Sequence, residues 1–203
     1  IINSQKRSFG KGAKVSLFTL GTMRATESLE KMYSVIKNAY YVGINHIETA
    51  PSYGDAESLI GNSIKKLEIE ENIKEKNWVI TTKILPKGDF EFLKNNFKNS
   101  LKNLNRKKIN NLAIHGLNLK HHLDWALVGE GKKFISWILE KELVDQVGFS
   151  SHGSYSLIKE AINCEVFNFC SLHLHYLDQS KITLAEQALK KGMGVLAISP
   201  ADK

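Results

Sequence analysis

Short apolar segments alternate with longer segments of helical periodicity along the whole chain, and this alternation limits the possible folds more than any other feature. The apolar segments predict β-strands, and between them apolar residues recur every three or four positions, as on one face of a helix. The expected strands span residues 15–22, 44–49, 78–83, 109–115, 144–150, 167–177 and 195–200. Strands that alternate with helices form parallel sheets with right-handed crossovers. The sequence therefore predicts an α/β fold with seven parallel strands.

Two architectures satisfy this alternation, an open doubly wound sheet and a closed eight-stranded barrel. An open sheet that binds a dinucleotide normally carries a GxGxxG turn after its first strand, and the segment LGTMRAT (20–26) lacks it. A barrel instead places its working residues at the carboxyl ends of successive strands. The expected strands close with the polar residues Glu48, Lys83, His115, Ser150, Ser171 and Ser199. We therefore predict a parallel (β/α)8 TIM barrel, present as an incomplete fragment of about seven strands.

The ends of the sequence give a second expectation about this barrel. The chain starts at Ile1 and stops at Lys203, shortly after the seventh expected strand. A closed barrel needs an eighth strand that pairs with the seventh and the first, because unpaired edges would open the apolar interior to water. We therefore expect a single barrel domain over residues 1–203, truncated after the seventh strand, with marginal stability and weak cofactor binding on its own.

Composition and charge exclude several other classes of protein. The net charge of +7 owes much to the Lys- and Asn-rich segment 94–108, which carries neither stacking aromatics nor a known nucleic-acid-binding module. Its lysines lie opposite an apolar helical stripe of Phe90, Leu93, Phe97, Leu101 and Leu104. We expect no nucleic-acid partner. Without an apolar run of about 18 residues, a signal segment or a CxxC pair, the chain is expected to be cytoplasmic, with Cys164 and Cys170 as core thiols.

Four residues near the strand ends have the chemistry needed to donate a proton to a substrate. Glu48, Lys83 and His115 close three neighbouring strands, and Tyr53 lies five residues beyond Glu48. A phenol, with an ordinary pKa of about 10, donates protons poorly near neutral pH unless a nearby cation favours its ionised form. Lys83 can be that cation, Glu48 can hold it in place, and His115 can orient a substrate carbonyl. The set suits a carbonyl oxygen that is protonated while the carbon receives a hydride.

A hydride donor must come from outside the protein, because no side chain can deliver one. We therefore predict a nicotinamide cofactor, either NADP(H) or NAD(H), and an aldehyde or ketone as the small-molecule substrate. Ser150, Ser151 and Ser171 are candidates for binding the cofactor's carboxamide across the barrel mouth. Further candidates for cofactor contacts at the ends of the first and seventh strands are Gly21, Thr22 and Ser199.

The motifs at these strand ends resemble those of a known enzyme family. The segments GINHIETAPSYGDAE, WVITTK, LAIHGLN and VGFSSHG are similar, in order, to strand-end motifs of the aldo-keto reductases. The resemblance covers nearly the whole chain and implies a barrel that reduces carbonyl compounds with NAD(P)H. It identifies Tyr53, Lys83 and His115 as the family's catalytic tyrosine, lysine and histidine. Glu48 stands where the family usually has aspartate, and Ser171 stands where many members have glutamine against the nicotinamide.

Three further segments of the sequence resemble one branch of that superfamily. The segments GLNLKHHLDWAL, FCSLHLHY and GMGVLAISPADK resemble a branch that also has glutamate at the position of Glu48. Longer members of this branch carry a ferredoxin-like iron–sulfur segment beyond the barrel. The resemblance implies an iron–sulfur cluster only in a missing C-terminal segment and no metal in residues 1–203.

Two other functions use the same barrel. A metal-dependent hydrolase could take His173 and His175 as ligands with His115 and Glu48, although Tyr53 would then have no role. The other alternative is a catalytically silent barrel that binds a nucleotide as a sensor or interaction subunit. The presence of all four catalytic residue types argues against this alternative.

Two residues close to the catalytic set are expected to be structural. Glu57 is expected to be an exposed residue in the first turn of a helix. His46 points the same way as Glu48 but deeper, so we expect a packed or hydrogen-bonded core histidine.

Overall fold

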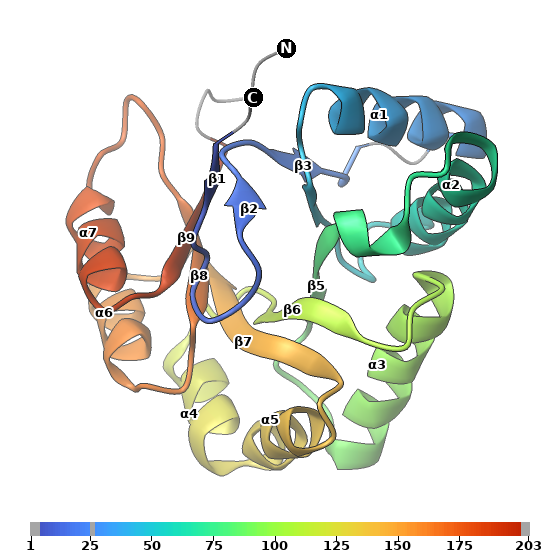
Figure 1. Ribbon diagram of the computed structural model, residues 1–203. Coiled ribbons are helices and arrows are strands. Elements are labelled where there is room, and N and C mark those ends of the chain that lie inside the picture. The colour runs from blue at the N-terminus through green and yellow to red at the C-terminus, as the bar shows by residue number, and fades with distance from the viewer. Residues whose placement is uncertain (1–4, 25–26, 200–203) are drawn as a thin grey trace.

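The computed structural model describes residues 5–24 and 27–199, and most of its strands form one curled parallel sheet (Figure 1). Two short strands, β1 (Lys6–Arg7) and β2 (Val15–Ser16), pair antiparallel as a hairpin. The parallel sheet contains β3 (Thr19–Gly21), β4 (His46–Glu48), β5 (Val79–Ile84), β6 (Ile109–Ile114), β7 (Val144–Ser151), β8 (Phe169–His173) and β9 (Gly194–Ile198). Each strand pairs with the next along the chain, so β3 and β9 form the sheet edges within the described residues.

The helices form an outer layer around this sheet (Figure 1). They are α1 (Leu29–Tyr41), α2 (Ala56–Glu71), α3 (Phe90–Asn103), α4 (Lys120–Val128), α5 (Glu130–Glu140), α6 (Tyr155–Asn163) and α7 (Ile182–Lys190), with a 3-10 turn at Glu75–Asn77. Every pair of neighbouring strands is joined through at least one helix, which places all carboxyl ends at one rim. The predicted (β/α)8 architecture is therefore confirmed as a seven-stranded part of such a barrel.

The sequence prediction was wrong about the first strand. The expected strand over residues 15–22 divides into β2, which belongs to the hairpin, and β3, which begins the parallel sheet. Ser16 breaks the run, because its hydroxyl donates to the carbonyl of Phe18 and accepts the backbone N–H of Asn45. Phe18 between the two strands is 70% exposed. Apolar character alone therefore does not make residues 15–22 one continuous strand.

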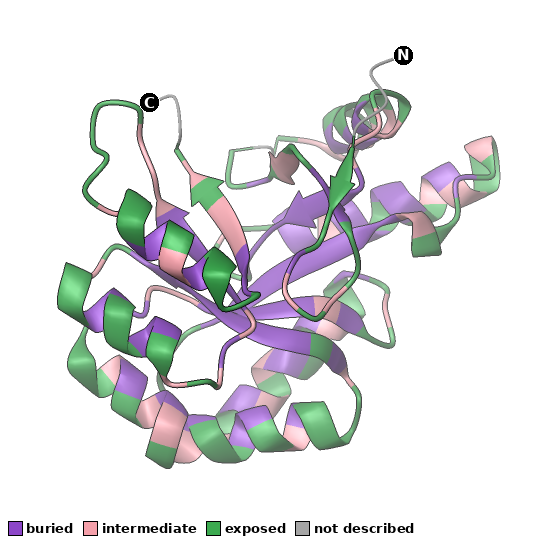
Figure 2. Cartoon of the chain, turned by 60° about the vertical axis from the view of Figure 1, so that its left-hand side comes forward, coloured by how far each residue is buried: buried purple, intermediate pink, exposed green. Residues whose placement is uncertain are grey.

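The main hydrophobic core lies between the sheet and the helices. Strand residues that face outward, such as Ile47, Ile80 and Leu112, are almost completely buried beneath the helix layer (Figure 2). The strands bury both faces, as expected for a parallel sheet curled around its own side chains. A second, smaller apolar cluster is formed by Phe9, Val15, Val79, Ala113 and Phe169. Phe9 comes from the hairpin, so the β1–β2 segment closes the amino-terminal end of the curled sheet.

A chain of hydrogen bonds crosses the interior of the sheet above this cluster. His46 bonds to the hydroxyl of Thr19 through Nδ1 (2.8 Å) and to that of Thr81 through Nε2 (2.7 Å). The Asn111 amide donates to the Thr81 hydroxyl (3.0 Å), and Gln146 donates to Asn111 Oδ1 (2.8 Å). The prediction that His46 is a hydrogen-bonded core histidine is confirmed. These polar side chains link β3 to β7 below the level of the candidate site.

The buried histidine predicts a specific dependence of stability on pH. Burial lowers the pKa of His46 to about 3, while a histidine in the unfolded chain has a pKa of about 6.5. Its contribution to stability is therefore present above about pH 6.5 and is lost as the pH falls toward 3, because only the unfolded chain then binds the proton. One such group changes the free energy of unfolding by at most about 1.4 kcal/mol per pH unit.

Denaturant titrations of the wild type and His46→Gln test this expectation. Between about pH 6.5 and 5, where few carboxyl groups titrate, the wild type should lose stability more steeply than the variant. Equal slopes for the two proteins would contradict the assignment, whatever their absolute stabilities.

Candidate active site

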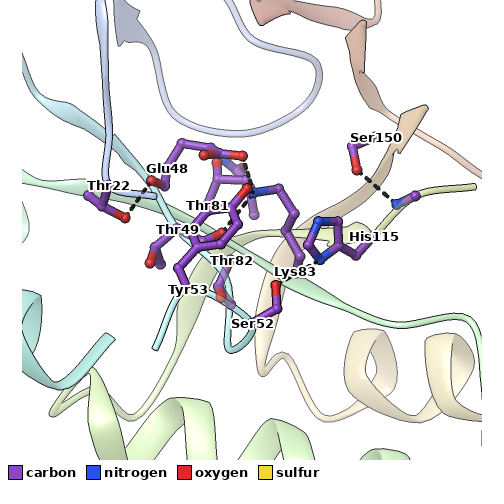
Figure 3. Close-up of polar contacts among 12 residues, drawn as sticks. Thr22, Glu48, Thr49, Ser52, Tyr53, Thr81, Thr82, Lys83, His115 and Ser150 are labelled. Carbon is purple, nitrogen blue, oxygen red and sulfur yellow. Dashed lines mark hydrogen bonds and ion pairs between the residues drawn. The ribbon is translucent and has the colours of Figure 1, made fainter. Parts of the chain in front are cut away.

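A buried ammonium group lies at the centre of the candidate site. Lys83, near the carboxyl end of β5, forms an ion pair with Glu48 at the end of the neighbouring β4 (Figure 3). Its Nζ atom also donates to the backbone carbonyl of Thr49 (3.0 Å) and to the hydroxyl of Tyr53 (2.8 Å). The lysine side chain is 3% exposed and that of Glu48 is 10% exposed. An ammonium carries three N–H donors, and each therefore has a partner.

Tyr53 reaches this ammonium from the loop between β4 and α2. The loop turns tightly, with the Tyr53 N–H bonded to the carbonyl of Ala50 (3.0 Å), and Gly54 adopts a left-handed φ of 59°. The Lys83 Nζ atom lies 4.4 Å from the centroid of the Tyr53 ring as well as within hydrogen-bond distance of its oxygen. Because lysine is the donor in that bond, the phenol keeps its own proton for another acceptor.

His115 completes the group from the end of β6. Its ring meets that of Tyr53 edge to face, with 6.0 Å between centroids and 90° between planes. Its backbone N–H bonds to the carbonyl of Ile84 (2.7 Å), and Nδ1 lies 3.4 Å from the hydroxyl of Ser52. Burial lowers the pKa of His115 to about 4, with further lowering by the positive charge of Lys83 and by His152. At neutral pH the imidazole is therefore uncharged, and one ring nitrogen carries a proton that it can donate to a carbonyl oxygen.

Two of the predicted cofactor residues present hydroxyl groups beside this cluster. Ser150 on β7 and Ser171 on β8 are register partners in adjacent strands. Ser150 accepts the backbone N–H of Gly116 (3.0 Å), which leaves its own hydroxyl proton available. Ser171 is 1% exposed, and its hydroxyl has no hydrogen-bond partner among the described residues. An unsatisfied buried hydroxyl costs free energy, so a ligand with a polar group at this position would relieve that cost.

Two others use their hydroxyl groups within the protein. The Thr22 hydroxyl donates to the backbone carbonyl of Glu48 (3.0 Å), and that of Ser151 donates to the carbonyl of Leu117 (2.6 Å). Both residues therefore shape the rim of the barrel in this structure. Gly21 is exposed, with no atom within 4 Å of an added Cβ, and the exposed Ser199 follows β9 with a left-handed φ of 52°.

Glu57 corrects an expectation from the sequence. It does lie in the first turn of α2, but it is 2% exposed rather than solvated. Its carboxylate accepts a hydrogen bond from Thr82 (2.6 Å), which faces the helix from the opposite side of β5 to Lys83. The helix packs closely here, so a first-turn position that is usually exposed is covered. Glu57 thereby ties the start of α2, just beyond the Tyr53 loop, to the strand that carries Lys83.

Two contacts of the site were not predicted from the sequence. The Thr49 carbonyl is the third partner of the Lys83 ammonium, and Ser52 lies beside the His115 ring. A backbone carbonyl is present at every residue, so no sequence signal marks the one that faces the lysine. Ser52 lies in the loop next to Tyr53, where its direction depends on the turn.

The structure gives little support to the metal-dependent alternative. No group of three or more His, Cys, Asp or Glu side chains in residues 5–24 and 27–199 is arranged to hold a metal ion. The His173 ring instead stacks against that of His175, with 6.0 Å between centroids.

None of the helices in the described part of the chain is long and apolar enough to cross a membrane.

The ion pair predicts a strong stability effect when one partner is removed. Lys83→Met should lower the free energy of unfolding by about 3–5 kcal/mol, because it leaves the Glu48 carboxylate buried without its counter-charge. Adding Glu48→Gln to that variant should recover part of the loss, since the unpaired charge is then gone. Denaturant unfolding of the two single variants and the double variant measures this coupling, and purely additive effects would contradict it.

Glu48→Asp tests whether the longer acid matters. If the lysine is positioned for glutamate, aspartate should weaken the pair and lower both stability and turnover. Full activity and wild-type stability in Glu48→Asp would show that the extra methylene is incidental.

The neutral state of His115 is a separate prediction. Nitrogen-detected NMR of the imidazole should give a titration midpoint of about pH 4, below the ordinary histidine pKa of about 6.5. Lys83→Met removes one of the positive charges that lower this pKa, so it should raise the midpoint. A midpoint of about 6.5 in the wild type would contradict the buried, cation-facing environment.

The chain is similar to known proteins in both sequence and fold. Residues 18–203 match the aldo/keto reductase family. A protein described as aldose reductase from Encephalitozoon cuniculi is 28% identical across 98% of this chain and 69% of its own length.

Solved structures show the same fold. A putative aldo-keto reductase from Pseudomonas aeruginosa superposes with a TM-score of 0.81, at 20% identity, over 98% of this chain and 79% of its own. A Bombyx mori aldo-keto reductase in complex with NADP superposes with a TM-score of 0.80, at 19% identity, over 99% of this chain and 68% of its own. The match over residues 18–203 shows that the chain belongs to the aldo/keto reductase family of oxidoreductases.

Proposed function

We propose that this protein reduces an aldehyde or ketone by hydride transfer from NADPH or NADH, with Tyr53 as the general acid. The observation that carries the proposal is the set of contacts made by one atom, Lys83 Nζ. That atom contacts the Glu48 carboxylate, the Thr49 carbonyl and the Tyr53 hydroxyl. Of these three partners, the phenol is the one whose O–H is free to be donated to a substrate, because the carboxylate and the carbonyl both accept from the lysine.

The chain's own residues account for the protonation half of the reaction. A nicotinamide cofactor, when bound beside Ser150 and Ser171, would supply the hydride for the carbonyl carbon. The Tyr53 proton moves to the carbonyl oxygen, which gives the alcohol and leaves negative charge on the phenol oxygen. Lys83 stabilises that charge at 2.8 Å. His115, uncharged and edge-on to Tyr53, donates a hydrogen bond that orients the carbonyl before transfer.

The serines beside the cluster support the choice of cofactor. Ser171 has a buried hydroxyl without a partner in the described residues, and Ser150 has a hydroxyl proton still to donate. A nicotinamide carboxamide offers both an acceptor and a donor, so these two residues suit it. The Bombyx mori relative is described as a complex with NADP, which supports NADP(H) as the first cofactor to test. The iron–sulfur cluster expected from the branch resemblance stays a prediction.

The same contacts favour an enzyme over a silent nucleotide-binding barrel. Binding a nucleotide needs no buried ammonium directed at a phenol. Burying Lys83 and Glu48 costs desolvation free energy, and hydrophobic residues of similar size would fill the same space without that cost. Retention of the charged pair beneath Tyr53 therefore supports proton transfer as the role of the cluster.

Removing the transferable proton tests this proposal directly. Tyr53→Phe keeps the ring but should lower kcat by about 10²-fold or more, with little change in the affinity for NADPH. Steady-state kinetics and fluorescence titration with NADPH measure the two quantities separately. Tyr155→Phe is the matched control, because its hydroxyl contacts only Thr183 on the outer helices among the contacts observed. Near-normal turnover in Tyr53→Phe would exclude the tyrosine as general acid.

A further inference from the structure

A hollow beside the catalytic cluster gives information about the substrate. It has a volume of about 260 Å³, and Lys83 and His115 form part of its wall. Its apolar wall comes from the loop after β5 and the first turn of α3, with the side chains of Leu85 and Phe92. A second hollow of about 380 Å³ shares Leu85, Lys87 and His115 with the first. The two hollows therefore adjoin and are treated as one groove, which is lined by Lys83 and His115 of the catalytic set and by Lys87.

The apolar wall of this groove is partly exposed, and one of its side chains packs against the backbone. Leu85 is 42% exposed and Phe92 is 45% exposed, although both are large apolar side chains at the rim of the site. Gly88 has a left-handed φ of 84°, and an added Cβ there would lie 2.3 Å from the Phe92 ring. The ring therefore packs directly against the glycine backbone. An exposed apolar wall beside reacting groups is typical of a surface that a ligand covers.

The charge of the groove is one-sided. No carboxylate lines either hollow, and Lys83 is already neutralised by Glu48. Lys87 has no carboxylate partner within 4.0 Å among the described residues. The nearest acid along the chain, Asp89, accepts the backbone N–H of Phe92 as the cap of α3. The groove thus offers an unpaired ammonium beyond its apolar wall.

We propose that the preferred substrates are compact carbonyl compounds whose apolar body lies against Leu85 and Phe92 and whose far end carries an anion bound by Lys87. This inference rests on the proposed carbonyl reduction at Tyr53 and adds the substrate class. The volume near the catalytic groups suits a body of about one aromatic ring, below the usual ~300 Å³ of a drug-sized site. A carboxylate on that body meets Lys87 where the two hollows join.

The experiment compares 4-carboxybenzaldehyde with its neutral analogue 4-formylbenzamide, using NADPH and the full chain. The wild type should reduce the carboxylate with a kcat/KM about three- to fivefold higher than the amide, as expected for one partly exposed ion pair. Most of the difference should lie in KM, because Lys87 is remote from the reacting atoms. Lys87→Gln should abolish the preference, and Lys87→Glu should reverse it.

Two further variants separate the groove from general effects. Lys98→Gln removes the same charge from an exposed position on α3 that lines neither hollow, so it should leave the preference unchanged. Phe92→Ala should raise the KM of both aldehydes roughly fivefold or more, because the apolar wall is lost for each. A carboxylate preference that persists in Lys87→Gln, or equal efficiency for both aldehydes in the wild type, would overturn the inference.

A binding measurement distinguishes failure of this inference from failure of the proposed function. Calorimetric titration with 4-(hydroxymethyl)benzoate and its amide reports recognition without turnover. If neither aldehyde is reduced while the benzoate binds through Lys87, carbonyl reduction at Tyr53 is wrong and the anion site stands. If both aldehydes are reduced and neither the benzoate preference nor the Lys87 dependence is found, the reduction stands and the anion site is wrong.

Discussion

The arrangement of the site follows from the need to satisfy one buried ammonium. A lysine that is 3% exposed cannot keep its charge unless each N–H has a partner and a counter-charge lies close by. Glu48, Thr49 and Tyr53 meet that need from β4 and the loop that follows it. Because these partners lie close together in the chain, their contacts with Lys83 also constrain the path of the loop. The contacts that satisfy the buried lysine are therefore the same contacts that place the Tyr53 hydroxyl beside it.

The rest of the sheet supports this geometry from below. The hydrogen-bond chain through His46, Thr81 and Asn111 joins β4, β5 and β6 in the interior, where a slip of one residue would break every bond. The register it favours is the one that brings Glu48, Lys83 and His115 to the same rim. On the outer side, the bond between Glu57 and Thr82 holds α2 against β5. Polar contacts on both faces of one strand thus position its last residues.

The sequence predicted the parts of this arrangement that depend on periodicity. Because side chains alternate along a strand, a strand that ends near Lys83 has Thr81 and Lys83 on its inner face and Thr82 on its outer face, which is the arrangement in β5. Polar residues at successive strand ends predicted which side chains would meet, because parallel strands bring their carboxyl ends together. These inferences needed only the local pattern and the direction of the strands.

Features that depend on packing between distant segments were not predicted. The β1–β2 hairpin is stabilised partly by Gln146, which lies 134 residues beyond Gly12, so no local pattern separates Val15 and Ser16 from the next strand. Burial of Glu57 depends on how closely α2 approaches β5, which a helical pattern does not specify. The bond from the Ser151 hydroxyl to the Leu117 carbonyl likewise depends on the path of a neighbouring loop, and the role of Ser151 toward a cofactor stays a prediction.

In the proposed reaction, the lysine-held tyrosine protonates a carbonyl as a hydride arrives at its carbon. A single turnover of an aromatic aldehyde with NADPH deuterated at the transferring C4 position, followed by mass spectrometry of the alcohol, tests both parts. Deuterium should appear on the carbinol carbon, rapidly with the wild type and far more slowly with Lys83→Met. An alcohol without deuterium, or the same rate of deuterium transfer in both proteins, would contradict it.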